Sequence, residues 1–463
     1  MIAAPWHGAS APAGRPSRSG TTGLATGLCG PYDRGRGSRI MPHTESHDSS
    51  LASAIAAFCQ EQVPDAQAQR DSFPKSEIWA AVAGTGTSLW LDTGDIDAAR
   101  ELWVQEFVAL TTNNTLLNKE VQKGIYDRLV PDVASLLRDR GVAGNDLVME
   151  IAFVLNAVHG LKLVRNFDAD VSVELHTAVS HDVEASYQYG KRFHAICPER
   201  FIIKVPLTPA GLLAARRLSD DGIRLNFTLG FSARQNWLIA ALAKPTWVNV
   251  FMGRINAFLS DNDLGDGRNA GEKATLASQR ALRRMKNQGG PDVRQIGASM
   301  RNGNQVDDLL GLDVFTMPTG AAKGFLELGR TPAEIVDKTG NDPEVSFADG
   351  VDADAWGLNC FWAIDNQFET AAAAAAGLDV ATATADDVLA ALREHGAGDL
   401  FPHLDPDEAV RVGTEGKIPV YTSWCERVRA GTASWDGMLT AAALASFTHD
   451  QNELDDRIRD LLA

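Results

Sequence analysis

The sequence is short of cysteine and of positive charge, and both shortages narrow the range of functions. Its 463 residues include five cysteines, an odd number that fits a reducing compartment better than a disulfide framework. The net charge of −17 and the isoelectric point near 5.0 argue against a nucleic-acid partner and an anionic membrane surface. A local basic pocket for a phosphorylated small molecule stays open. The cysteines are far apart, at Cys29, Cys59, Cys197, Cys360 and Cys425.

Long hydrophobic runs are the third shortage. We identify no apolar stretch that approaches the roughly 20 residues of a membrane helix, and no secretory signal pattern at the start. The chain is therefore expected to be soluble and cytoplasmic, with no membrane partner. Residues 1–45 are rich in Gly, Ala, Ser, Pro and Arg without hydrophobic periodicity, which predicts disorder. They are either a transit-like segment or residues upstream of a true start at Met41, and we favour the second.

The sequence does contain an alternation of short apolar runs with longer helical segments. This alternation implies a parallel sheet, and eight units over roughly 240 residues match a (β/α)8 barrel. We predict an α/β fold, a TIM barrel with additional N- and C-terminal helices, in which residues 46–330 form the barrel and a helical preface. A doubly wound open sheet is the alternative. The predicted strands are Ser88–Thr93, Val108–Asn114, Asp170–Thr177, Phe201–Thr208, Ile223–Gly230, Thr246–Arg254, Val293–Met300 and Val314–Pro318.

The fourth of these runs places a single lysine, Lys204, among apolar residues. Desolvation disfavours the ammonium form, so such a lysine is expected to have a lowered pKa and to supply a free amine for attack on a carbonyl. A strand-end lysine that extends its charge to solvent is the simpler explanation for a lone lysine. The polar residues that the other runs carry at their ends favour the first explanation.

Side chains at the carboxyl ends of barrel strands build the active site. Each of them alone could be a satisfied core amide, a helix cap or a solvated arginine, but their convergence on a buried lysine predicts catalysis. A carboxylate among them could take the proton from the hydroxyl at a breaking carbon–carbon bond, and two guanidinium groups with a hydroxyl suit a phosphate. The candidates are Asp92, Thr111, Asn113, Glu174, Lys204, Asn226, Thr228, Asn249, Arg254, Ser299 and Arg301.

Seven segments within about residues 85–330 resemble, in this order, those of the transaldolase family of Schiff-base enzymes. The resemblance implies a barrel that needs no metal or organic cofactor. It also implies a transferase of the pentose phosphate pathway that moves a dihydroxyacetone unit between phosphorylated sugars, from sedoheptulose 7-phosphate or fructose 6-phosphate to an aldose phosphate. The segments are Trp90–Thr93, Thr111–Leu117, Val173–Glu174, Ile203–Pro206, Leu225–Ser232, Val250–Ile255 and Gly297–Asn302.

The resemblance further implies a role for each candidate. Lys204 would be the Schiff-base lysine and Asp92 the acid and base at the cleaved bond. Glu174 and Thr228 would together activate the water that shuttles protons. The substrate-binding set would be Asn113, Asn226 and Asn249 on the hydroxyl side, and Arg254, Ser299 and Arg301 around the phosphate.

Some positions depart from the family pattern. Asn114 stands where the family usually has proline, and Asn249 stands where it usually has serine, which bears on substrate preference. Phe251 and Glu174 stand where the related aldolase that cleaves fructose 6-phosphate has tyrosine and glutamine, which favours transfer over free aldol cleavage. His176 is expected to be structural.

Residues 331–463 are predicted to form a helical extension that packs on the barrel without a separate activity, since no phosphate loop, metal cluster or nucleophile motif occurs there. Two functional alternatives stay open: a Schiff-base enzyme that acts on another phosphosugar, and a non-catalytic barrel that binds a partner. The sequence also leaves a homodimer open. The intact set of Lys204, Asp92, Glu174 and Thr228 argues against the non-catalytic barrel. Helices are predicted near Glu327–Thr339, Val351–Ala376, Ala385–His395, Asp405–Thr414 and Ser434–Leu462.

Overall fold

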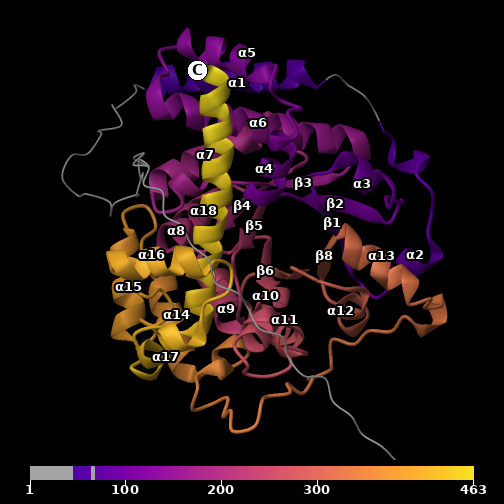
Figure 1. Cartoon of the computed structure of the whole chain (residues 1–463), viewed down its shortest axis with the longest axis vertical. Coiled ribbons are helices and arrows are strands. Elements are labelled where there is room, and N and C mark those ends of the chain that lie inside the picture. Colours follow the sequence, from indigo (N-terminus) through magenta and orange to yellow (C-terminus); the bar gives the residue numbers. More distant parts are fainter. Residues whose placement is uncertain (1–44, 64–67) are drawn as a thin grey trace, which may run out of the picture. The chain divides into compact units, whose positions relative to one another are not determined.

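A closed barrel of eight parallel strands forms the centre of the protein, whose computed structural model describes residues 45–63 and 68–463 (Figure 1). The strands pair in sequence order, and β8 returns to pair with β1. This confirms the predicted (β/α)8 fold and rules out the open sheet. The strands are β1 (Ser88–Asp92), β2 (Phe107–Thr111), β3 (Asp170–Glu174), β4 (Phe201–Pro206), β5 (Leu225–Thr228), β6 (Trp247–Phe251), β7 (Arg294–Ala298) and β8 (Val314–Pro318).

Several strands end earlier than predicted because a helix cap follows them directly. Asn113, Thr208, Ser232 and Asn302 are each the residue before a helix, and each side chain accepts a backbone N–H three residues further on. These caps join strand to helix within a few residues. The polar residues that follow the strands are thereby held at the carboxyl rim of the barrel.

The fourth strand shows why the barrel can hold a lysine in its interior. All six residues of β4 are buried, as expected for a strand covered on both faces. Ile203 lies against Gly190 on the helical layer outside the sheet. Lys204, the next residue, must then point to the other side, into the barrel.

Helices surround the barrel, and two of them precede β1. Disorder is predicted for residues 1–45, and all of these except Glu45 lie outside the described residues. The helices up to β8 and just after it are α1 (Glu45–Gln62), α2 (Glu77–Gly84), α3 (Ile96–Arg100), α4 (Asn114–Gln122), α5 (Leu129–Arg138), α6 (Gly144–Phe167), α7 (Val183–Ile196), α8 (Pro209–Asp220), α9 (Ala233–Leu242), α10 (Met252–Asp261), α11 (Ala270–Asn287), α12 (Gly303–Asp308) and α13 (Thr319–Glu327), with short 3-10 turns η1 (Arg70–Ser72) and η2 (Thr177–Val179).

The C-terminal region follows the prediction in part. The helix predicted near Glu327–Thr339 is wrong, because α13 ends at Glu327 and Pro332 starts only a short 3-10 turn. The predicted helix Val351–Ala376 is helical mainly in its last part, after Asp365 caps α14. The observed elements are η3 (Pro332–Glu334), η4 (Leu358–Phe361), α14 (Asn366–Ala376), α15 (Ala385–Glu394), α16 (Pro406–Glu415), α17 (Tyr421–Arg429) and α18 (Trp435–Leu462).

One helix corrects the statement that no apolar run is long enough to span a membrane. Within the described residues, α6 meets the length and hydropathy criteria for a membrane span. In this structure 89% of its apolar window is buried against the rest of the protein. Burial of this kind is typical of a helix in a protein core.

Candidate active site

Lys204 lies inside the barrel beside two polar residues of neighbouring strands. Glu174 of β3 pairs with Lys204 of β4, which pairs with Asn226 of β5. Residues paired in this way point to the same side of a parallel sheet. The three side chains therefore form one inward layer, and all three are buried, with 3% of Lys204 exposed. The structure brings together residues that are far apart in the sequence.

The ammonium group of Lys204 has two partners within the barrel. Its Nζ donates a hydrogen bond to the Thr112 carbonyl at 3.0 Å and lies 3.1 Å from Oε2 of Glu174. The charge therefore does not extend to solvent. The Glu174 carboxylate is a counter-charge that the sequence did not predict, and it offers a nearby acceptor for the proton that the amine must lose before it can attack a carbonyl.

Glu174 has the properties of a group that exchanges protons. Burial raises the pKa of its carboxyl above the ordinary value, the positive charge of Lys204 opposes this, and the negative charge of Asp92 adds to it. A carboxyl whose pKa lies closer to neutrality is a better acid and base catalyst. The Glu174 backbone is fixed by Asn156 of α6, whose side chain donates to its carbonyl at 2.9 Å.

Asp92, at the end of β1, is held by a short chain of hydroxyls. Oγ1 of Thr111 donates to Oδ1 of Asp92 at 2.7 Å and lies 2.6 Å from Oγ1 of Thr316. Since the Thr111 proton is used for Asp92, Thr316 is the donor in the second bond. Burial raises the pKa of Asp92, opposed by the charge of Lys204 and by the Thr111 hydrogen bond.

The amide and hydroxyl candidates differ in how many of their polar atoms already have hydrogen-bond partners. Asn226 donates to Ser172 at 3.1 Å, and Asn249 donates to Asn226 at 3.4 Å. Oδ1 of Asn249 and Oγ1 of Thr228 are buried and have no hydrogen-bond partner among the described residues. Such buried groups favour a bound water or substrate hydroxyl. Asn113 is partly used by the fold, since its Oδ1 accepts the Leu116 N–H at 2.8 Å as the cap of α4.

Two arginines meet where β6 and β7 end. Arg254 lies in the first turn of α10, and its Nη1 is buried without a partner among the described residues. Burial and the positive charge of Arg301 lower the pKa of Arg254 to about 10. Two neighbouring cations at a helix N-terminus with an unused donor form an arrangement that attracts an anion.

Gly253 makes the close approach of the two arginine-bearing segments possible. A Cβ atom at this position would lie 2.2 Å from the Ser299 carbonyl oxygen and 2.7 Å from Nε of Arg301. Ser299 itself adopts a positive φ of 62°, which turns the chain sharply after β7. The absent side chain of Gly253 and this turn place the three predicted phosphate residues in one corner of the barrel mouth.

Sequence reasoning missed the residues that α18 adds to the site. Phe447 packs beside Phe251 with ring centroids 6.4 Å apart, and Asp450 accepts a hydrogen bond from Thr115. His176, expected to be structural, interacts with Asp455 of α18 at 3.3 Å. These residues lie roughly 200 or more positions from most barrel partners, and no local pattern in a long helix identifies such contacts.

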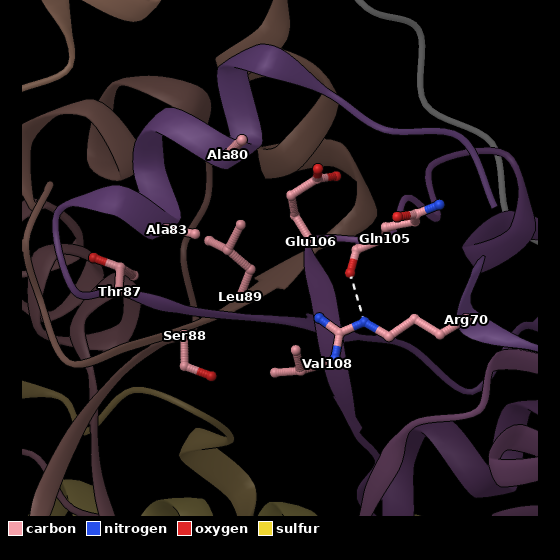
Figure 2. A pocket seen from close by; sticks show the side chains of 9 residues that line it. All are labelled: Arg70, Ala80, Ala83, Thr87, Ser88, Leu89, Gln105, Glu106 and Val108. Carbon is pink, nitrogen blue, oxygen red and sulfur yellow. Dashed lines mark hydrogen bonds between the residues drawn. The ribbon is translucent and has the colours of Figure 1, made fainter.

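A cavity of about 410 Å³ lies away from this site, at the amino ends of β1 and β2. Figure 2 shows its charged and polar side chains, among them Arg70 bonded to the Gln105 carbonyl at 2.8 Å. Glu106 accepts the Ser76 N–H at 3.1 Å. Catalytic groups of TIM barrels gather at the carboxyl ends of strands, so this cavity is not a candidate for the chemistry.

No group of three or more His, Cys, Asp or Glu side chains that could hold a metal ion occurs within residues 45–63 and 68–463. The expectation that the chemistry needs no metal stays a prediction.

Comparison with known proteins agrees with the resemblance seen in the sequence. A profile of the Transaldolase/Fructose-6-phosphate aldolase family matches residues 89–375, which extends past the barrel to α14. A transaldolase of Gloeobacter violaceus is 31% identical over 264 residues, which are 55% of this chain and 65% of that protein. A transaldolase of Xanthomonas oryzae pv. oryzae is 30% identical over 282 residues, 57% of this chain and 84% of that protein. A transaldolase of Prochlorococcus marinus is 27% identical over 262 residues, 55% of this chain and 77% of that protein.

Proposed function

The chain belongs to the transaldolase and fructose-6-phosphate aldolase family, and from this we propose that it is a transaldolase, a transferase of aldehyde and ketone residues. It would transfer a dihydroxyacetone unit from sedoheptulose 7-phosphate to glyceraldehyde 3-phosphate, giving erythrose 4-phosphate and fructose 6-phosphate, in the pentose phosphate pathway. The observation that carries the proposal is the buried ion pair of Lys204 with Glu174, 3.1 Å long, in a layer with Asn226.

The first half of the reaction uses the Lys204 amine as the nucleophile. Glu174 accepts the ammonium proton, and the freed nitrogen lone pair adds to the C2 carbonyl of the ketose phosphate. The resulting carbinolamine loses its hydroxyl as water, with the proton returned from Glu174 through a water held by the unpartnered Thr228 hydroxyl. A Schiff base between Lys204 and C2 results.

Asp92 then acts at the bond that breaks. Its carboxylate takes the proton from the C4 hydroxyl, the C3–C4 bond breaks, and the electron pair moves into the Schiff base to leave an enamine on Lys204. The aldose phosphate departs. When the acceptor aldose phosphate enters, C3 of the enamine attacks its aldehyde carbon, and Asp92 returns the proton to the new hydroxyl. Water finally adds to the Schiff base and releases the new ketose phosphate from Lys204.

The phosphate group is proposed to bind at the corner formed by Arg254, Ser299 and Arg301. Nη1 of Arg254 is a buried donor without a partner among the described residues, and burying such a donor is costly unless a ligand uses it. A phosphate brings several acceptor oxygens and a negative charge to the two guanidinium groups. Asn113, Asn226 and Asn249 would bind the sugar hydroxyls between this corner and Lys204.

Borohydride trapping tests the proposal. The protein is incubated with fructose 6-phosphate and borohydride, with and without erythrose 4-phosphate, and the adduct is located by intact and peptide mass spectrometry. We expect a mass gain on Lys204 that is absent in Lys204→Met, and sedoheptulose 7-phosphate formed only when the acceptor is present. The matched control is Lys162→Met, which removes a lysine from α6 outside the barrel interior.

Two results would redirect the proposal. An adduct on Lys204 without transfer to erythrose 4-phosphate would indicate Schiff-base chemistry on another phosphosugar. No adduct with any ketose would leave a barrel without this catalysis. The cytoplasmic location, the homodimer and the division of the chain at residues 45 and 330 stay predictions.

A further inference from the structure

The last helix of the chain, α18, lies across the carboxyl ends of several barrel strands. In Figure 1 it is the long yellow helix that begins near α17 and ends near α5. Its contacts with the barrel rim come from residues spread over about four turns, so the middle part of the helix is positioned by the segments that follow the strands of the site. In chain order the contacts are Thr440 with the Leu229 carbonyl after β5, Phe447 with Phe251 of β6, Asp450 with Thr115 after β2, and Asp455 with His176 after β3.

One of these contacts involves a residue of the proposed phosphate corner. The guanidinium carbon of Arg254 lies 5.6 Å from the ring centroid of Phe447 and 5.7 Å from that of Phe251. Phe447 is 3% exposed and Arg254 is 6% exposed, so the interaction is largely shielded from water. A cation held near aromatic rings in such a setting is attracted more strongly than at the surface.

The rings hold the guanidinium group without using its N–H donors. Nη1 of Arg254 has no hydrogen-bond partner among the described residues, which is unusual for a buried arginine, although the carboxylates of Asp450 and Glu174 lie close enough to act on its charge. A carboxylate partner would fix the side chain but would also occupy the donors that a phosphate needs. Two aromatic rings can restrict the position of the side chain and leave those donors unoccupied.

We propose that α18 completes the phosphate end of the site, and that Phe447 is a positioning residue that holds Arg254 ready for the substrate phosphate. This inference rests on the proposed function, in which Arg254 binds that phosphate. Asp450, one turn further along α18, supports the arrangement, because its bond to Thr115 ties the helix to α4 on the opposite side of the mouth.

The experiment compares three variants at two phenylalanines of the C-terminal region, Phe447 and Phe361, whose rings lie against residues of α10. Phe447→Met keeps most of the volume and removes the ring, whereas Phe447→Tyr keeps the ring. Phe361→Met is the matched control, because Phe361 is also buried and packs on Phe258 of α10, at 6.2 Å between centroids, and not on Arg254. For each protein we measure KM and kcat with fructose 6-phosphate, the inhibition constant of inorganic phosphate, and Lys204 trapping with unphosphorylated dihydroxyacetone.

Loss of the ring is expected to act on phosphate binding. Phe447→Met should raise both the KM for fructose 6-phosphate and the inhibition constant of phosphate roughly five- to thirtyfold. The kcat value and the trapping of dihydroxyacetone should stay close to those of the wild type, since neither depends on the phosphate corner. Phe447→Tyr and Phe361→Met should retain the wild-type inhibition constant. If Phe447→Met does not fold, Phe447→Leu replaces it under the same criteria.

The inference is overturned if phosphate inhibits Phe447→Met as well as the wild type, or if Phe361→Met weakens inhibition equally. A purely structural role would lower the melting temperature of both variants without this split between KM and kcat. Failure of the proposed function gives a different result, namely no Lys204 adduct in the wild type. The Phe447 variants can then still be compared by the rise in melting temperature on addition of inorganic phosphate.

Discussion

The buried cluster around Asp436 is expected to hold the C-terminal region on the barrel. Asp436 is fully buried and accepts hydrogen bonds from Ser232 at 2.7 Å and from Nε and Nη2 of Arg234, both at 2.8 Å. Arg234 also donates to Asp399 at 2.8 Å. Ser232 and Arg234 follow β5, whereas Asp436 begins α18, so this cluster joins the helix to the strand that carries Thr228.

Asp436→Asn removes the charge and leaves the shape nearly unchanged. Loss of one partner from a buried ion pair costs about 3–5 kcal/mol, and because Asp399 remains we expect about 3 kcal/mol. Asp342→Asn is the control, since Asp342 likewise pairs with basic side chains, those of Lys273 and Arg280, but its own side chain is 62% exposed. An exposed pair of this kind contributes about 0–1 kcal/mol.

Hydrogen exchange measured by mass spectrometry is the assay for this difference. If α18 detaches by local opening, 3 kcal/mol corresponds to roughly a hundredfold faster exchange of its N-terminal amides in Asp436→Asn. The whole-chain melting temperature should fall by only a few degrees, about 3–4 °C, because a chain of this size has a large unfolding entropy.

The effect should depend on pH in a known direction. Burial alone would raise the pKa of Asp436, but the charge of Arg234 and the hydrogen bonds outweigh it, so that the pKa in the folded protein lies below the ordinary value of 3.8. The stabilisation is therefore complete above pH 3.8 and is lost as the pH falls through the lowered pKa. Equal exchange rates of α18 in Asp436→Asn and Asp342→Asn at pH 7 would refute this reasoning.

Two further predictions concern the site. Gly253→Ala should displace the turn at Ser299, at a cost of about 1–3 kcal/mol, and should raise the KM for fructose 6-phosphate. The control is Gly320→Ala, whose added Cβ has no atom within 4 Å and should leave the KM unchanged. Equal KM values for the two variants would contradict the close approach of Ser299 to Gly253. Because burial raises the pKa values of Asp92 and Glu174 and both must be ionised to accept protons, kcat/KM should fall with decreasing pH on a limb above the ordinary values of 3.8 and 4.5. Glu174→Gln should change that limb, and a wild-type limb at or below pH 3.8 would exclude these groups as the bases.

The barrel could be predicted from the sequence because its signals are local. Eight apolar runs with polar residues at their ends, separated by helical segments, specify a parallel sheet, and the position of Lys204 within β4 follows from alternation along one strand. Strand ends were less accurate, because residues such as Asn113 and Ser232 extend the run in sequence but leave the strand as helix caps. The cap hydrogen bond competes successfully with sheet pairing at these positions.

The contribution of the C-terminal region could not be predicted in the same way. The helical spacing of Trp435–Leu462 predicts a helix, but the partners of Phe447 and Asp436 lie about 200 residues earlier in the chain. The helix expected near Glu327–Thr339 failed for a local reason, since Pro332 removes a backbone donor and favours a turn. Long-range pairs of this kind are determined by how the elements pack, which a single sequence does not contain as a pattern.

The charges inside the barrel are consistent with the proposed role of α18. Glu174 and Lys204 carry opposite charges, Asp92 lies partly buried near the charge of Lys204, and Arg254 lies near the positive charge of Arg301 and the carboxylates of Asp450 and Glu174. Lys204 and Glu174 form an ion pair, whereas Arg254 lies toward the mouth without one among the described residues. A phosphate can then use the Arg254 charge without separating the Lys204 pair. We propose that aromatic contact from Phe447 holds this arginine without using its N–H donors, whereas the nearby Asp450 carboxylate accepts a hydrogen bond from Thr115 and makes no ion pair with Arg254 among the described residues.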